Sequence, residues 1–241
     1  MTIHLEAPIQ TADNHVAGLA AAAQDMSSQD TLEETLRSIT RHAQETFAHS
    51  SVAVALTAES GKIMTAAATD RDVQRAEALQ LEWSEGPSLD ALHGAPSAVV
   101  EDLRFDGRWR FWAPQAADLG FRSALTVGLG NQQTFGALAL YSRRSYAYTA
   151  DHVELASSFG QHVSVALTHV RQRSVLQRAL TTQALVAQAE GILMERHGIT
   201  ADKAYQVLER FATYKGLALL DVAQHMVSHR RLPEVDGGSA A

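Results

Sequence analysis

Apolar residues recur at helical spacing in three consecutive segments near the C-terminal end of the chain. Their apolar positions are Leu185/Ala189/Ile192/Leu193, then Ala204/Val207/Leu208/Phe211, then Leu219/Val222/Ala223/Met226. This spacing places each set on one face of a helix. Gly198 and Gly216 follow the first two segments and can take the positive φ that ends a helix. We expect Thr200 to cap the second helix, so the pattern predicts a compact bundle of three helices.

Upstream of this bundle, residues 149–196 form one long helical pattern. Gly160 and Gly191 are the only helix-disfavouring residues in it. Patterns longer than about 25 residues are typical of coiled coils and of helices that connect domains. We therefore predict a connecting helix with dimer contacts at its two ends. The expected seam passes through Phe159, Val163, Ala166 and Val170, and then through Leu180, Ala184 and Ala187.

The first two thirds of the chain mix strand and helix patterns. Residues 51–57 alternate Val52, Val54 and Leu56 with smaller residues, which is typical of a strand. Further strands are expected at 62–69, 98–100, 123–129 and 135–141, the last two joined at Gly130-Asn131, and helices at 28–47, 72–83 and 109–118. This order predicts an α+β fold in which helices flank an antiparallel sheet. Residues 1–26 have no sustained period and are expected to be a flexible segment or a loosely packed helix.

Composition narrows the class of protein. The chain has 241 residues, of which 46% are hydrophobic and 20% charged, as in ordinary globular proteins. It contains no cysteine, which excludes disulfides, thiolate metal sites and thiol nucleophiles. No apolar run approaches the ~20 residues that span a bilayer, and the N-terminus does not have the pattern of a secretory signal. We expect a cytoplasmic protein without membrane contact.

The charge is distributed unevenly. The net charge is -7, which by itself does not favour a nucleic-acid partner. Residues 174–232, however, carry seven Lys and Arg against five Asp and Glu. This weak basic bias permits RNA binding without requiring it.

Two groups of motifs resemble known families. The C-terminal motifs Gly191-Ile192-Leu193-Met194 and Leu219-Leu220-Asp221-Val222-Ala223 resemble the ANTAR domain, the RNA-binding output module of bacterial transcription antiterminators. Four earlier motifs are similar to a GAF domain, in particular to those fused to ANTAR domains in actinobacterial regulators: Glu85-Gly86-Pro87-Ser88-Leu89-Asp90-Ala91, Asp106-x-Arg108-Trp109, Gly120-Phe121-Arg122-Ser123 and Phe135-Gly136-Ala137-Leu138. The resemblance implies a GAF-like sensor at 27–172, an ANTAR-like domain at 173–232 and a flexible tail at 233–241.

The ANTAR resemblance implies a structured RNA partner, a double-hairpin leader bound by a homodimer. The expected RNA-binding residues are Arg178, Thr182, Gln183, Arg196, Lys203, Arg210, Tyr214 and Lys215. Relatives usually carry basic residues where Gln183, Glu190 and Ala218 stand, and missing cations weaken phosphate contacts. Two interpretations therefore remain: a signal-responsive antitermination regulator, or a sensory and scaffolding dimer whose bundle contacts protein instead of RNA.

The GAF resemblance implies a pocket for an unknown small molecule, or a site for a protein signal. The expected pocket residues are Trp83, Ser88, Trp109, Trp112, Phe121 and Tyr141, although core packing is the favoured explanation for the aromatic residues. Ser88 is not expected to be a nucleophile because Asp90 stands where a nucleophile elbow needs glycine. His225 and His229 lie four residues apart but lack the pattern of a metal site. We expect no catalytic residue, metal or cofactor, and consider an enzyme the least favoured class.

Overall fold

The computed structural model describes residues 7–48, 50–131 and 133–233, with side chains from residue 18 onward. Contacts divide the chain into two compact units at Arg171, and each unit is described by itself. The elements of the first unit are α1 (Ala7–Ser28), α2 (Leu32–Thr46), β1 (Ser51–Thr57), β2 (Ile63–Ala68), α3 (Arg71–Trp83), α4 (Pro87–Leu92), β3 (Ser97–Val100), α5 (Trp112–Asp118), β4 (Ser123–Gly130) and β5 (Thr134–Ser142). The long helix α6 (Ala150–His197) follows, and α7 (Ala201–Lys215) and α8 (Leu219–His229) complete the second unit.

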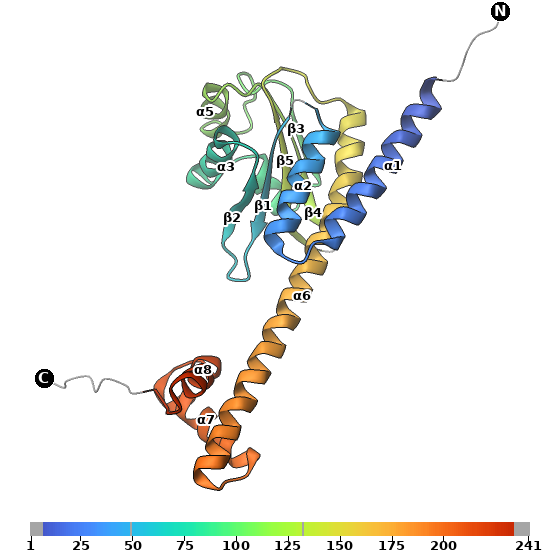
Figure 1. Ribbon diagram of the computed structural model, residues 1–241. Coiled ribbons are helices and arrows are strands. Elements are labelled where there is room, and N and C mark those ends of the chain that lie inside the picture. The colour runs from blue at the N-terminus through green and yellow to red at the C-terminus, as the bar shows by residue number, and fades with distance from the viewer. Residues whose placement is uncertain (1–6, 49, 132, 234–241) are drawn as a thin grey trace, which may run out of the picture. The chain divides into compact units, whose positions relative to one another are not determined.

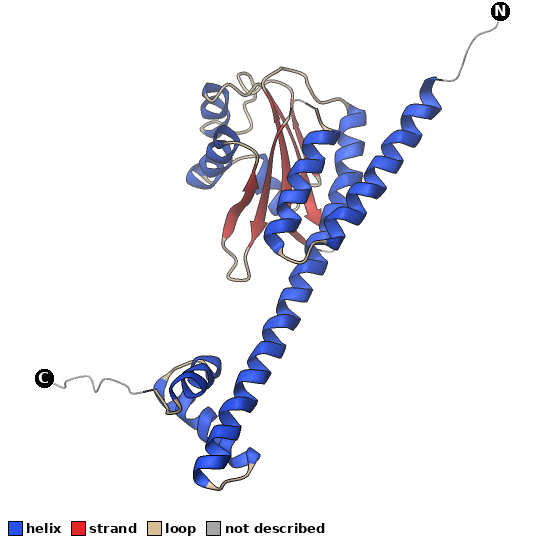
Figure 2. Cartoon of the chain, viewed as in Figure 1, coloured by secondary structure: helices blue, strands red, loops and turns tan. Residues whose placement is uncertain are grey.

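The first unit is built on a five-stranded antiparallel sheet with the strand order β2-β1-β5-β4-β3. Leu138 on the central strand β5 pairs with Val54 on β1 and with Val127 on β4. Helices cover both faces of this sheet, with α1, α2 and the first part of α6 on one side and α3 and α5 on the other (Figures 1 and 2). This arrangement confirms the predicted α+β class.

The two faces of the sheet differ in side-chain size. The face toward α2 and α6 carries large buried residues, which stand at every second position of the strands: Val52, Val54, Leu56, Leu125, Val127, Leu129, Leu138 and Leu140. On the opposite face the inner strands mostly present alanines: Ala53, Ala55, Ala124, Ala137 and Ala139. Because alanine adds little thickness, α4 can pack directly against Ala55 and Ala137 on this second face.

The N-terminal helix α1 packs against the core of the first unit. In α1, Ala22 and Met26 are buried in the core that α2 and α6 share. The carboxylate of Asp25 accepts a hydrogen bond from Ser38 Oγ and pairs with Arg41, both on α2. Of the two expectations for residues 1–26, a flexible segment or a loosely packed helix, the structure has a helix from Ala7 onward. The predictions for residues 1–6 and 234–241 concern residues outside those that the structure describes.

The second unit is a three-helix core formed by the end of α6 with α7 and α8. Its buried residues are Val186, Ala189, Leu193, Ala204, Leu208, Ala212, Val222, Ala223 and Met226. Gly216 ends α7 at a φ of 64°, and its N–H donates to Ala212 and Thr213 carbonyls, as the sequence predicted. Thr200 occupies the N-cap position of α7, but its side chain makes no capping hydrogen bond. The cap expected there from its hydroxyl was wrong.

The helix α6 contributes to both cores, and this corrects the predicted dimer seam. Phe159, Val163, Ala166 and Val170 are buried against the sheet of their own unit, so this half of the seam is an intramolecular contact. Residues 172–184 contribute nothing to the core clusters of the described chain. In this bare segment, Leu176 is 61% exposed and Leu180 is 56% exposed. Over the described residues, no helix has the length and apolar character needed to cross a bilayer.

We expect Phe159→Ala to lower the free energy of unfolding by about 3–5 kcal/mol, because it empties a fully buried ring site. The ring of Phe159 meets that of Phe47 edge-to-face at 6.1 Å, which adds to the loss. Phe105→Ala is the matched control, since Phe105 is 80% exposed and its change should stay within ~0.5 kcal/mol. Equal effects of the two substitutions in urea unfolding would contradict this core assignment.

Candidate functional site

A buried polar network lies on the alanine face of the sheet, and its centre is Glu77. The helix α3 begins after Asp70, whose carboxylate accepts the Val73 N–H at 2.9 Å. From this start, Glu77 and Gln80 lie one turn apart on the buried face of α3. Both side chains are almost completely enclosed, and Glu77 is only 3% exposed. A carboxyl group in this position needs partners, because an unpaired buried polar group is costly.

Three donors converge on one oxygen of Glu77. The Tyr141 hydroxyl donates to Oε1 at 2.7 Å, Gln80 Nε2 at 2.9 Å and Ser88 Oγ at 3.0 Å. The donors come from three different elements, β5, α3 and α4. The network therefore ties the start of α4 to the sheet and to α3.

Gly86 allows α4 to begin at this point. Its φ is 141°, and a Cβ there would lie 2.2 Å from Gln80 Oε1. That same oxygen accepts the backbone N–H of Ser88 at 2.8 Å. A side chain at residue 86 would displace the Gln80 amide and break this link.

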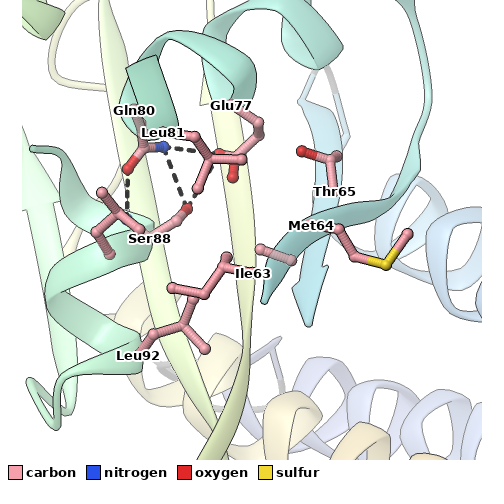
Figure 3. A pocket seen from close by; sticks show the side chains of 10 residues that line it. Ile63, Met64, Thr65, Glu77, Gln80, Leu81, Ser88 and Leu92 are labelled. Carbon is pink, nitrogen blue, oxygen red and sulfur yellow. Dashed lines mark hydrogen bonds between the residues drawn. The ribbon is translucent and has the colours of Figure 1, made fainter. Parts of the chain in front are cut away.

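Beside the network is a small cavity. Figure 3 shows Glu77, Gln80 and Ser88 on one side of it and the apolar side chains of Ile63 and Leu92 on the other. The remaining lining residues are Ala55, Met64, Thr65, Leu81 and Leu89. The cavity has a volume of about 10 Å³, which is close to the minimum for one water molecule. In this conformation the pocket is nearly closed.

Burial controls the protonation of the network. Loss of hydration raises the pKa of Glu77 to about 7, and the hydrogen bonds from Tyr141, Ser88 and Gln80 oppose this shift. Burial, with Glu77 next to it, also raises the pKa of Tyr141 well above its usual value. Glu77 thus titrates near neutral pH, while Tyr141 remains a hydrogen-bond donor.

The structure brings together only some of the predicted pocket residues. Ser88 lines the cavity and Tyr141 reaches it through Glu77. Trp109, Trp112 and Phe121 are buried in the core between α3, α5 and the sheet and do not line the cavity. Trp83 is 46% exposed, stacks on Phe111 at the surface and does not line this cavity.

Sequence reasoning missed Glu77 and Gln80. The available signal was their spacing, because both follow Val73 and Ala76 onto the apolar face of α3. A charged residue on such a face indicates a buried partner or a site. No group of three or more His, Asp and Glu in the described residues is arranged to hold a metal ion.

In the second unit, one face of α7 combines cations with an aromatic ring. Lys203, Arg210 and Tyr214 follow one another at intervals of seven and four residues, which places them on one side of the helix. All three are exposed, and Tyr214 is 80% exposed. The Lys215 ammonium lies 4.7 Å from the centre of the Tyr214 ring. We call these four residues the α7 face.

The predicted residues on α6 are more dispersed. Arg178, Gln183 and Arg196 are exposed and Thr182 is half-buried. Gln183 and Glu190 lie seven residues apart and share a side of the helix, so Glu190 adds negative charge next to an expected contact. Ala218 is exposed at the N-cap of α8. The strongest concentration of suitable side chains is therefore the α7 face.

Comparisons with known proteins agree with this division. Residues 29–168 match the family model of the GAF domain, and residues 174–227 match that of the ANTAR domain. A comparison with curated proteins found no match.

Several solved structures share the fold. The GAF domain from a phosphoenolpyruvate-protein phosphotransferase of Coxiella burnetii is 14% identical, with a TM-score of 0.57 over 68% of this chain and 98% of that chain. A free methionine-R-sulfoxide reductase from Neisseria meningitidis, solved with its substrate, is 14% identical, with a TM-score of 0.54 over 71% and 98%. The photosensory core module of Stigmatella aurantiaca phytochrome is 9% identical, with a TM-score of 0.58 over 91% and 47%. At these identities the likeness concerns the fold alone.

We expect Glu77→Gln to change how stability depends on pH. The folded-state pKa of about 7 lies above the usual 4.5, so the folded state binds more protons between these values. Wild-type stability should therefore fall by a few kcal/mol from about pH 4.5 to about pH 7 and level off above. The variant should lack this decline relative to wild type in urea unfolding.

The matched control is Glu82→Gln, which changes a half-exposed glutamate on the same helix. The difference in the free energy of unfolding between Glu82→Gln and the wild type should change little across this pH range. If Glu77→Gln also gives a flat difference, Glu77 does not titrate near neutral pH.

Proposed function

Because the chain belongs to the GAF domain family and carries an ANTAR domain after it, we propose that it is a signal-responsive transcription antitermination regulator. GAF and ANTAR domains are regulatory domains. In this proposal the first unit receives a small-molecule signal, and the second binds a double-hairpin leader RNA. The observation that carries the proposal is the presence of an exposed cationic and aromatic face on the ANTAR bundle.

The α7 face has the chemistry that RNA hairpin loops require. Lys203 and Arg210 offer positive charge to phosphates, and the exposed ring of Tyr214 offers a surface on which an unstacked base can stack. Lys215 lies next to the Tyr214 ring and adds a third cation to the α7 face. Arg178 and Arg196 on α6 would contribute further phosphate contacts. These residues support RNA binding despite the acidic balance of the whole chain.

The bare segment of α6 supports a homodimer. Val175, Leu176 and Leu180 are each more than half exposed on a stretch that contributes to neither core. A helical stretch of 13 residues without packing is marginally stable in water, and these side chains provide the apolar surface that a second copy would cover. A dimer formed here would also supply two ANTAR bundles for two hairpins.

The same helix offers a route for the signal. Phe159 and Val163 fix the first part of α6 on the sheet of the GAF unit, whereas Ala189 and Leu193 are part of the ANTAR core. A change in the GAF unit that alters how the bare segments of two copies pair would also change how the two ANTAR bundles are presented to RNA. We propose this as the mechanism by which the signal reaches RNA.

A second function is favoured by the charges on α6. Glu190 and Gln183 stand where ANTAR relatives are expected to carry cations, and both lie on one side of the helix. If the absence of these cations abolishes RNA affinity, the protein is a sensory and scaffolding dimer whose bundle contacts protein. The two candidates differ in a single measurable property, the affinity for structured RNA.

We expect the full chain to shift a double-hairpin leader RNA in a gel at low salt, and to bind a scrambled hairpin more weakly. Arg210→Ala should weaken binding several-fold and lower the salt slope by about one, because one phosphate contact is lost. Arg37→Ala is the matched control, since Arg37 is an exposed arginine on α2 in the first unit. It should leave the affinity unchanged.

The charge-restoring variant Glu190→Lys with Gln183→Arg should bind at least tenfold more tightly at moderate salt, since it replaces a negative charge and adds two cations. Failure of the wild type to bind above the scrambled RNA at low salt would contradict the proposed function. If only the charge-restoring variant then bound, the scaffolding alternative would be supported.

A further inference from the structure

One oxygen of the Glu77 carboxylate accepts no hydrogen bond from the residues that the structure describes. Tyr141, Gln80 and Ser88 all donate to Oε1, and no described residue donates to Oε2. Glu77 is 3% exposed and lines the cavity beside it. The network therefore holds the carboxyl group fixed through Oε1 and leaves the second oxygen of Glu77, which lines the cavity, available to whatever enters the pocket (Figure 3).

The described residues give the Glu77 carboxylate no cationic partner. The three donors on Oε1 favour the ionised carboxylate, and burial opposes it and raises the pKa of Glu77 to about 7. Arg75, which lies two positions before Glu77 on α3, pairs with Glu82, and Arg143 pairs with Asp72. On α4, Asp90 accepts from Trp109 Nε1. No described residue thus supplies Glu77 with a counter-ion.

The rest of the pocket is apolar and small. Ile63, Leu81, Leu89 and Leu92 surround the hollow, with Ala55 on the sheet behind it. Met64 is 49% exposed and Leu81 is 39% exposed, so the two side chains at the opening have room to move. Methionine adapts easily to a new neighbour. An occupant must therefore be short and mostly apolar apart from its charged end.

We propose that this pocket binds a small organic ammonium ion, a protonated amine on a short hydrocarbon body, with Glu77 Oε2 as its counter-ion. The inference rests on the proposed sensory role of the GAF unit, for which it names the chemical class of the signal. The ammonium group donates to Oε2, and the hydrocarbon body displaces Met64 and Leu81 outward and packs on Ile63 and Leu92.

The test measures binding of n-butylamine, n-butanol and butyrate to the full chain by calorimetry. These probes share a hydrocarbon body and differ in the charge of the head group. We expect n-butylamine to bind at least tenfold more tightly than n-butanol, and butyrate not to bind. Glu77→Gln should lose the preference for the amine, whereas Glu82→Gln, on the same helix, should keep it.

A second measurement separates ion pairing from simple filling of the pocket. Because burial raises the pKa of Glu77 to about 7, binding of the ammonium ion below that pH requires Glu77 to release its proton. The affinity for n-butylamine should therefore fall up to tenfold from about pH 7 to about pH 6 and be nearly constant above about pH 8. Tyr141, the other titratable group in the network, stays protonated throughout.

The outcomes are distinguishable. Equal affinity for amine and alcohol, an unchanged preference in Glu77→Gln, or no binding of n-butylamine would overturn the inference. Tighter binding of butyrate or n-butanol would assign the pocket to an anionic or neutral ligand instead. The RNA gel shift on the same preparation tests the proposed function separately, because amine binding without RNA binding would leave this inference standing.

Discussion

The constraint on which the rest of the structure depends is that one helix serves two cores. The first part of α6 is buried against the sheet and its last part is buried against α7 and α8, so neither core is complete without it. The bare segment between them keeps helical geometry without apolar packing in its own chain. Because exposed helices of this length gain little stability by themselves, the segment is where a second copy or a signal can act with the least cost to either core.

The size difference between the two sheet faces explains why the pocket lies where it does. Large residues fill the face toward α2 and α6 and leave a solid core. Alanines on the opposite face let α4 approach the sheet closely, and Gly86 lets that helix start next to Gln80. The result is a site in which a fixed carboxylate meets a small apolar hollow. Its closed form indicates that an occupant must move side chains at the opening, which is a simple way to convert binding into a conformational change.

Much of the fold could be predicted because the spacing of apolar residues indicates which face of a helix or strand is buried. The strand at 51–57 and the helix over 149–196 were recovered within one residue, since each has a clear pattern and clear ends. For the first helix the sequence left a flexible segment and a loosely packed helix open, because only a few of its positions, among them Ala22 and Met26, are buried. The half-seam at Phe159 was assigned to the wrong partner, since spacing shows that a face is buried but does not show what covers it. For the same reason Trp83 was placed in the pocket, whereas Glu77, its central residue, was overlooked.

The most direct measurement is amide hydrogen exchange over residues 172–184 of the full chain, compared with the variant Leu176→Glu with Leu180→Glu. If a second copy covers the bare segment, its amides exchange slowly in the wild type and quickly in the variant, while the amides of both cores stay protected in each. Fast exchange of the segment in the wild type, or protection that the variant leaves unchanged, would contradict the account.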